Sequence, residues 1–335
     1  MVAVRNSRAK WGIVVAIAGV SVLAALFVLT GERPSLSASG APTAVFENGV
    51  TTTRKVNLPS VLGSEQAETP RSTDTDGITT APCGLMARSA RQCDVLTPPG
   101  IGPTERLPVV ILLHGFHQRP EDVIADGGWR RTVLSARLVL VAPFGLEHSW
   151  NAGGCCGPAQ STGIDDAGFL DQVIDRINAR SDVDTSRMFM VGESNGGMMV
   201  HRYLCGSRHR LAGAASVSGT SVADCPPTAS LPFIEIHGLA DVTVPAAGSW
   251  SETPFVDGTT FAPVLQAVEA VAASAGCTTD AVANSVGSVD VLNWSGCRDG
   301  ASVRYVMLRN RGHEWPTAPV YPATTEILRF FGLVA

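Results

Sequence analysis

Short apolar runs and amphipathic stretches alternate along the chain from Cys83 onward. The apolar runs are rich in β-branched, aromatic and other large side chains and predict strands at Gln92–Leu96, Val109–Leu113, Leu138–Ala142, Met188–Val191, Ala214–Val217, Phe233–Ile236 and Val303–Leu308. The stretches between them predict helices at Asp166–Ser181, Gly197–Leu204, Phe261–Ala275 and Ala323–Phe331. Strands that alternate with helices indicate an α/β fold, with a mainly parallel central sheet and helices on both faces. In such a sheet the ligand site lies at the carboxyl ends of the strands.

The N-terminal region has a different pattern. Residues Trp11–Thr30 form an uncharged apolar run of about 20 residues, which is long enough to span a bilayer. Basic residues precede it, and they are expected to stay inside: Arg5, Arg8 and Lys10. Small residues follow at Ser35–Ala41, as they do at a cleavage site. We therefore expect residues 1–31 to be a cleaved signal peptide or an N-terminal membrane anchor, and both options place the rest of the chain outside the cytoplasm.

Residues 32–81 are rich in Ser, Thr, Pro and Ala, and we expect them to form a polar linker. Residues 82–335 are enough for one large α/β domain with a substantial core. The 335-residue chain is 45% hydrophobic, has a net charge of -5 and carries no basic block in this part. Nucleic acid is therefore not an expected partner, and contact with a membrane is expected only through the N-terminal segment.

The cysteine content agrees with export, because an even number of cysteines in an exported chain indicates disulfides. Each of the pairs Cys83–Cys93 and Cys277–Cys297 would close a short loop flanked by turn residues, and we predict both. The remaining cysteines form two further bridges among Cys155, Cys156, Cys205 and Cys225. Adjacent Cys155 and Cys156 could bridge each other only in a strained ring, so we expect them to have different partners. A metal site is the competing interpretation, but no C-x-x-C or His/Cys cluster supports it, and no metal or cofactor is predicted.

The most informative motif is the run M-F-M-V-G-E-S-N-G-G at residues 188–197. It has the form of an apolar strand that enters G-x-S-x-G and then a helix. On such a sharp turn, Gly192 and Gly196 remove the Cβ atoms that would clash, and the Ser194 hydroxyl is exposed above the sheet. The motif is common by chance, and an ordinary glycine-rich turn is the alternative. The residues at the other strand ends must therefore decide between these two interpretations.

Two later strand ends carry a carboxylate and an imidazole. Asp241 follows the strand that begins at Phe233, and His313 follows the strand Val303–Leu308. The order Ser194, Asp241, His313 is that of the α/β-hydrolase triad. An imidazole can accept the serine proton, and a carboxylate on its other nitrogen fixes the tautomer. We therefore predict Ser194 as the nucleophile, His313 as the general base and then acid, and Asp241 as the orienting carboxylate.

The strand Val109–Leu113 ends in His114-Gly115, where the loop of such a site donates one oxyanion-hole amide. We predict that the backbone amides of Phe116 and Asn195 form this hole, and that His114 supports the loop by hydrogen bonding. Aromatic side chains near the predicted triad are candidate substrate contacts, with core packing as the alternative for the tryptophans: Trp150, Trp315 and His117. Asp165 and Asp166 are expected to cap the following helix.

Several motifs together resemble a known family: L-H-G at residue 113, C-C-G at 155, D-D-A-G-F at 165, G-E-S-N-G-G at 192, H-G with Asp241, and G-H-E-W-P at 312. The chain resembles the exported esterases grouped with poly(3-hydroxybutyrate) depolymerases and feruloyl or acetyl-xylan esterases. The resemblance runs from Cys83 to the C-terminus. It implies that residues 82–335 are a catalytic domain with the α/β-hydrolase fold and without a metal, and that this domain cleaves carboxylic esters through an acyl-enzyme. No long insertion separates the strands after Ser194, so no large lid domain is expected. The depolymerases commonly carry Cys where this chain has Phe116, which counts against a specific polyester assignment.

The expected partner is therefore an ester substrate, either polymeric or carbohydrate-linked: a polyhydroxyalkanoate oligomer, a feruloyl ester or an acetyl ester. An acyltransferase that uses the same triad is one alternative. A non-catalytic cell-envelope binding protein is another, but a binding role gives no reason for all three of Ser194, Asp241 and His313.

Overall fold

The computed structural model describes residues 72–84, 91–251, 256, 259–278 and 281–335. They belong to the unit that spans Glu65–Ala335. The predicted targeting segment, Trp11–Thr30, lies outside the described residues. In the part of the chain that the structure describes, no helix has the length and apolar character needed to cross a membrane.

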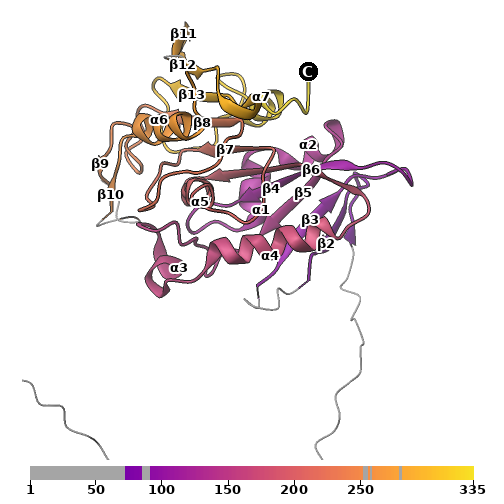
Figure 1. The fold of residues 1–335 in the computed structure, drawn as a ribbon. Helices are drawn as coiled ribbons and strands as arrows, with labels where there is room; N and C mark the ends of the chain where they lie inside the picture. Colours follow the sequence, from indigo (N-terminus) through magenta and orange to yellow (C-terminus); the bar gives the residue numbers. More distant parts are fainter. Residues whose placement is uncertain (1–71, 85–90, 252–255, 257–258, 279–280) are drawn as a thin grey trace, which may run out of the picture. The chain divides into compact units, whose positions relative to one another are not determined.

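An eleven-stranded sheet runs through this unit in the order β1-β2-β3-β5-β4-β6-β7-β8-β13-β12-β11 (Figure 1). Its strands are β1 (Ser72–Thr73), β2 (Thr79–Pro82), β3 (Cys93–Thr97), β4 (Leu107–Leu113), β5 (Val139–Pro143), β6 (Val183–Glu193), β7 (Gly213–Val217), β8 (Phe233–Gly238), β11 (Val282–Val286), β12 (Val289–Trp294) and β13 (Val303–Leu308). All neighbours from β5 to β13 pair in parallel, whereas the strands at both edges pair antiparallel. The prediction of a mainly parallel central sheet is confirmed.

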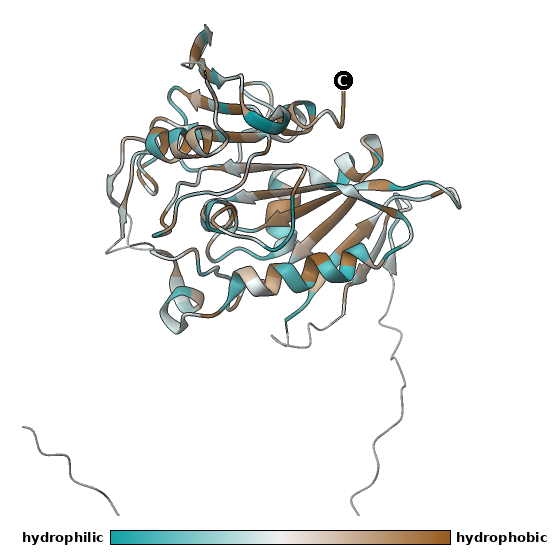
Figure 2. Ribbon diagram, viewed as in Figure 1, coloured by the Kyte–Doolittle hydropathy of each residue, from teal (hydrophilic) through white to brown (hydrophobic). Residues whose placement is uncertain are grey.

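Helices cover both faces of the sheet, as Figure 2 shows by the brown strands enclosed between amphipathic helices. They are α1 (Pro120–Asp126), α2 (Trp129–Ser135), α3 (Gly157–Thr162), α4 (Asp166–Asn178), α5 (Asn195–Tyr203), α6 (Val264–Ser274) and α7 (Ala323–Phe330). Side chains alternate along β4, so that Val109 and Ile111 pack into a core with α4, α5 and α6. Val110 and Leu112 pack on the other face with α1, α2 and α7. No described element forms a separate lid domain.

All seven strands predicted from apolar runs exist, and the four predicted helices do too, with ends that differ by a few residues. The boundary of the predicted linker is wrong at its C-terminal end. Strand β2 pairs with β3 through Thr79–Thr97 and Pro82–Asp94, so the sheet already includes residues assigned to the linker. Its backbone completes an otherwise open sheet edge, which favours pairing although its side chains are small or polar.

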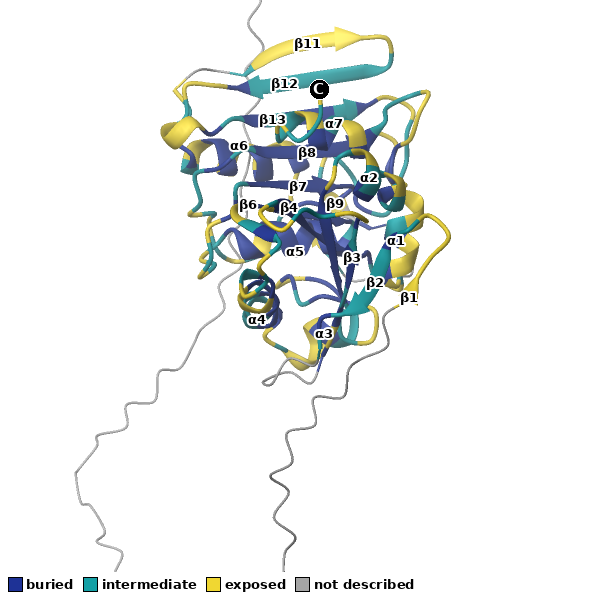
Figure 3. Cartoon of the chain, turned by 90° about the vertical axis from the view of Figure 1, so that its right-hand side faces the viewer, coloured by how far each residue is buried: buried dark blue, intermediate teal, exposed yellow. Residues whose placement is uncertain are grey.

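The hairpin β11–β12 and the short helices α1–α3 were not predicted. Val282 and Val286 of β11 are 58% and 80% exposed, so this edge strand lacks the alternating burial that produces a recognisable pattern (Figure 3). A second, two-stranded sheet pairs β9 (Ser249–Trp250) with β10 (Thr260–Phe261).

All eight cysteines form disulfides. The predicted pairs Cys83–Cys93 and Cys277–Cys297 are confirmed. The expectation that Cys155 and Cys156 have different partners is wrong, because these neighbours bridge each other. The loop after β7 folds back on the end of α5, where the Thr228 amide donates to the Leu204 carbonyl at 2.8 Å. This contact brings the remaining two cysteines together as the bridge Cys205–Cys225.

Candidate active site

Ser194 lies on the turn between β6 and α5 with a φ of 52° and a ψ of -117°. Residues other than glycine rarely adopt this backbone conformation, and its occurrence at Ser194 matches the strained turn expected of G-x-S-x-G. A Cβ at position 192 would collide with the Gly196 carbonyl, and one at position 196 would collide with the Leu113 carbonyl. Both glycines are therefore required for the close approach of β4, β6 and α5 that holds the Ser194 hydroxyl out.

The structure brings Ser194, Asp241 and His313 together from three different strand ends. The Nε2 atom of His313 lies 2.8 Å from Ser194 Oγ, and its Nδ1 atom lies 2.8 Å from Asp241 Oδ2. Because a carboxylate can only accept, Nδ1 carries a proton and Nε2 is free to accept the serine proton. Hydrogen bonding to Nδ1 thus selects the tautomer that a general base requires.

Asp241 is held by several donors although it is only 4% exposed. Its Oδ1 accepts the amides of Thr243 and Val244, each at 2.8 Å, and its Oδ2 lies near His313 and His237. Burial alone would raise the pKa of Asp241, but the hydrogen bonds from the two histidines hold it well below its usual range. Asp241 therefore stays ionised behind His313.

The loop after β4 lies against the turn at Ser194, since a Cβ at position 115 would lie 3.4 Å from the Ser194 Cβ. No acceptor for the amides of Phe116 and Asn195 is found among the described residues, which leaves both N–H groups available. His114 fixes this loop: its Nδ1 donates to the Gly115 carbonyl at 2.8 Å, and its Nε2 accepts the Gly145 amide at 3.0 Å. Burial lowers the pKa of His114 to about 4, so the ring is neutral and can serve both bonds.

Trp150 does not provide the substrate surface suggested by the sequence, because its side chain is completely buried. Its indole N–H donates to the His114 carbonyl at 2.9 Å, and its backbone exchanges two hydrogen bonds with the Asn195 side chain, at 2.7 and 3.0 Å. The core-packing alternative is therefore correct. Trp150 joins the loop after β4 to the first residue of α5, and it orients the two backbone segments that carry Phe116 and Asn195.

The other two aromatic candidates differ from each other. Trp315 lines the pocket beside Ser194, but it is 6% exposed and packs edge-on against Trp129 at a ring distance of 5.8 Å. His117 is exposed, stacks on Phe116 at 3.8 Å and is not among the residues that line this pocket. Trp315 thus has both a packing role and a place at the site, whereas His117 lies outside the pocket.

The two aspartates before α4 also differ. The Asp165 side chain accepts the Gly168 amide at 2.8 Å and caps the helix as expected. Asp166 is buried and pairs with Arg91 at 2.5 Å while it accepts the Asn151 amide at 2.6 Å. It therefore anchors the loop that follows Trp150 rather than only capping the helix.

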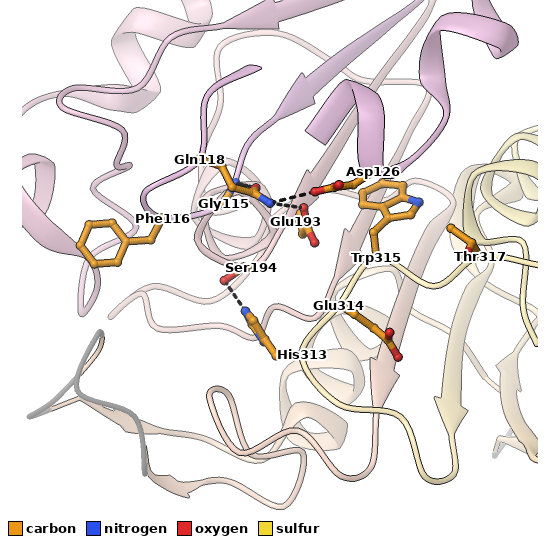
Figure 4. Close-up of a pocket in the computed structure, with 10 residues that line it drawn as sticks. All are labelled: Gly115, Phe116, Gln118, Asp126, Glu193, Ser194, His313, Glu314, Trp315 and Thr317. Atoms are coloured by element: carbon orange, nitrogen blue, oxygen red, sulfur yellow. Dashed lines mark hydrogen bonds between the residues drawn. The ribbon is translucent and has the colours of Figure 1, made fainter. Parts of the chain in front are cut away.

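A pocket of about 500 Å³ opens beside the Ser194 hydroxyl (Figure 4). One wall is a polar cluster that the sequence did not reveal. The Gln118 Oε1 atom accepts the Gly115 amide at 2.6 Å, and its Nε2 donates to Glu193 at 3.1 Å and to Asp126 at 3.3 Å. Gln118 thereby ties the loop after β4 to the residue before the serine.

Glu193 is 6% exposed, and Gln118 is the one hydrogen-bond partner found for its carboxyl group within the described residues. Burial raises the pKa of Glu193 to about 6, against the lowering effect of the hydrogen bond from Gln118. The sequence signal for this group was its place inside G-E-S-N-G, but that position gives no indication of burial. No group of three or more potential metal ligands occurs among the described residues.

No family model matches the chain. It is 26% identical over 267 residues to a protein of Nocardia uniformis named as an esterase, NocK, covering 74% of this chain and 78% of that one. It is 23% identical over 237 residues to a bifunctional acetylxylan esterase/xylanase of Neocallimastix patriciarum, covering 69% of this chain and 32% of that one. It is also 26% identical over 174 residues to feruloyl esterase B of Piromyces equi, covering 50% and 31%.

Among solved structures, the acetyl xylan esterase of Aspergillus awamori superposes with a TM-score of 0.52 at 12% identity, over 79% of this chain and 99% of that one. This likeness concerns the fold. With the strand order and the turn at Ser194, it confirms the expected α/β-hydrolase architecture. The chain is thus similar in sequence to proteins named as esterases, and it shares the α/β-hydrolase fold.

Proposed function

We propose that this protein is an extracytoplasmic serine esterase that cleaves its substrate through an acyl-enzyme. The observation that carries the proposal is the continuous hydrogen-bonded line from Ser194 through His313 to Asp241, with both contacts at 2.8 Å. Ser194 attacks the ester carbonyl while His313 takes its proton, and His313 then protonates the leaving alcohol. Water repeats the attack with His313 as base and releases the acid.

The amides of Phe116 and Asn195 are proposed to hold the oxyanion of each tetrahedral intermediate. Both belong to segments fixed by hydrogen bonds through His114, Gln118 and Trp150. Because these donors are in place before substrate binds, they stabilise developing charge without reorganisation. The same geometry would serve an acyltransferase, so the nature of the acyl acceptor must be determined from products.

The proposed location outside the cytoplasm is supported by four disulfides. We assign residues 1–31 to a signal peptide or membrane anchor, and residues 82–335 together with strand β2 to the catalytic domain. For the substrate, we propose a carbohydrate-linked acetyl or feruloyl ester, because acetylxylan esterase and feruloyl esterase are the named activities of two relatives. A polyester oligomer is the second option.

The central test is hydrolysis of a p-nitrophenyl ester by the wild-type protein and Ser194→Ala. We expect kcat to fall by at least about 10⁴-fold in the variant, because the nucleophile is removed. A serine-directed fluorophosphonate should phosphonylate Ser194 Oγ in the wild-type protein alone, with loss of HF, so that the mass rises by that of the reagent minus HF. Activity that survives in Ser194→Ala would refute the acyl-enzyme route.

A panel of acetylated xylan, methyl ferulate, short acyl esters and 3-hydroxybutyrate oligomers then separates the substrate classes by kcat/KM. Added sugar acceptors test the acyltransferase alternative, since transfer would give acylated sugars in place of free acid.

A further inference from the structure

Behind Asp241, the structure holds buried polar side chains for which the proposed function gives no role. His237 and Glu235 lie two residues apart on β8, and His201 of α5 contacts Glu235. Both β8 side chains are completely buried, and His201 is 4% exposed. Polar side chains of this kind remain buried only when partners compensate for the lost water, so their contacts indicate what they do.

His237 shares the carboxylate of Asp241 with His313. The Nε2 atom of His237 lies 2.8 Å from the Val244 carbonyl oxygen, which can only accept, so this nitrogen carries a proton. The same nitrogen lies 3.3 Å from Asp241 Oδ2, the oxygen that His313 Nδ1 contacts at 2.8 Å. The two ring nitrogens are therefore at most about 6 Å apart, and only one carboxylate oxygen separates them.

The second nitrogen of His237 faces another carboxylate. Its Nδ1 atom is buried without a hydrogen-bond partner among the described residues and lies 3.8 Å from Glu235 Oε1. Glu235 accepts the Ser216 hydroxyl at 3.1 Å and contacts His201 Nε2 at 3.0 Å. An imidazole between two buried carboxylates is electrostatically favoured as a cation.

The balance of effects on His237 supports this charge. Burial by itself lowers the pKa of His237, but its interactions with Asp241 and Glu235 outweigh burial and raise the pKa to about 9. Among the described residues, the other titratable groups near these carboxylates are His313 beyond Asp241, and His201 with Tyr305 beyond Glu235.

We propose that His237 is a cationic positioning residue that opposes a second positive charge on His313 and so keeps this base unprotonated in mildly acidic solution. The inference rests on the proposed serine-esterase function. Two positive charges about 6 Å apart repel each other even at an effective dielectric of about 20. The site would thus remain active at a lower pH than an isolated Ser–His–Asp triad.

The test is the pH dependence of kcat/KM, from about pH 4 to 9, for the wild-type protein and His237→Gln. Glutamine can still donate towards the Val244 carbonyl and Asp241, but it cannot carry a charge. We expect its acid limb to move to higher pH by about one unit or more. At pH 8 the variant should lose less than about threefold in kcat/KM. Its KM should not change, because His237 does not line the pocket.

Ser216→Ala is the matched control. It removes a buried hydrogen bond from the same group of side chains, at Glu235, but leaves the contacts of His237 in place. Its acid limb should coincide with that of the wild-type protein. If His237→Gln and Ser216→Ala share the wild-type profile, or if both profiles move equally, the charge on His237 has no effect on His313 and the inference fails.

A second measurement needs no variant. In ¹⁵N/¹³C-labelled wild-type protein, the two ring nitrogens of His237, assigned through its own backbone, should both show the chemical shifts of a protonated imidazole at pH 7. A neutral His237 with only Nε2–H would overturn the proposal, even if His237→Gln did not fold.

The two proposals fail in different ways. If Ser194→Ala is as active as the wild-type protein, the proposed function falls, and the NMR measurement alone decides the charge of His237. If Ser194→Ala is inactive but His237→Gln keeps the wild-type acid limb, the serine-esterase function stands and the inference about His237 is wrong.

Discussion

Two buried carboxylates lie close to the Ser194 hydroxyl, and the protein gives them opposite electrostatic properties. Asp241 is 4% exposed and Glu193 is 6% exposed, so burial does not distinguish them. Asp241 accepts two backbone amides and contacts two histidines, whereas one donor, Gln118, contacts Glu193. The pKa of Asp241 is accordingly held well below its usual range, while that of Glu193 is raised to about 6.

The comparison shows that the number and charge of hydrogen-bond donors, more than depth of burial, decide which carboxylate stays ionised. Asp241 faces His313, and the role that we propose for it needs a constant negative charge. Glu193 faces the pocket, where its charge changes near pH 6. The following experiments test each side of this difference, from the largest expected effect to the smallest.

Asp241→Asn should have the largest effect. The amide cannot supply the charge that orients and stabilises the His313 imidazolium, so kcat should fall by on the order of 10³–10⁴-fold. Steady-state hydrolysis of a p-nitrophenyl ester at pH 8 measures this loss. Glu193→Gln is the matched control and should lose less than about tenfold. Equal losses in the two variants would show that the carboxylates do not differ in function.

Gln118→Ala should have the next largest effect, because it frees the Gly115 amide and disconnects the loop after β4 from Glu193. A displaced oxyanion-hole donor should lower kcat by about 10- to 100-fold, with little change in KM. Arg119→Ala, at the exposed neighbouring position, should retain wild-type kcat. A selective rise in KM in Gln118→Ala would instead identify Gln118 as a ground-state substrate contact.

Glu193→Gln should change the pH dependence of stability. A raised folded-state pKa means that the stabilising effect of the protonated form is present below about pH 4.5 and is lost as pH rises through about 6. At pH 8 the free energy of unfolding of the neutral variant should therefore exceed that of the wild type by up to about 2 kcal/mol. At pH 4 the two values should be about equal. Urea denaturation at the two pH values measures this. A constant difference would mean that Glu193 does not titrate as its burial implies.

Asp126→Asn should have the smallest effect. This carboxylate also contacts Gln118, but its side chain is exposed, so solvent screens its charge. We expect the free energy of unfolding to change by less than about 0.5 kcal/mol, and kcat/KM by less than about twofold. If Asp126→Asn changed the free energy of unfolding as much as Glu193→Gln does, the charge of Asp126 would matter as much as that of Glu193.

The sequence was sufficient for those parts of the fold in which burial and chemistry coincide. Buried strands such as β4 and β5 show as continuous apolar runs because both of their faces are covered. Ser194, Asp241 and His313 follow such strands, so the topology alone predicts that they converge. The structure brings them together.

Other features depend on three-dimensional contacts that no local pattern records. Trp150 is a residue type typical of substrate contacts, but its ring is fully buried and donates a hydrogen bond to the backbone of the loop after β4. The bridge between Cys155 and Cys156 follows from the pairing of Cys205 with Cys225, and only the folded chain shows that pairing. Gln118 and His237 matter through partners 75 and four residues away in the sequence, respectively, and a single sequence does not reveal such pairs.

Helix α7 holds Trp315 in place from outside the pocket. The Trp315 indole donates to the Thr324 hydroxyl at 3.0 Å, and that hydroxyl donates to the Gly127 carbonyl at 2.6 Å. Helix α7, the last helix of the chain, thus supports a wall of the pocket from outside the site. Because α7 also packs on the core of the sheet, only substitutions at its exposed positions would test this support without disturbing the fold. Random mutagenesis of α7 offers a route to new ester preferences at a distance from the reacting atoms.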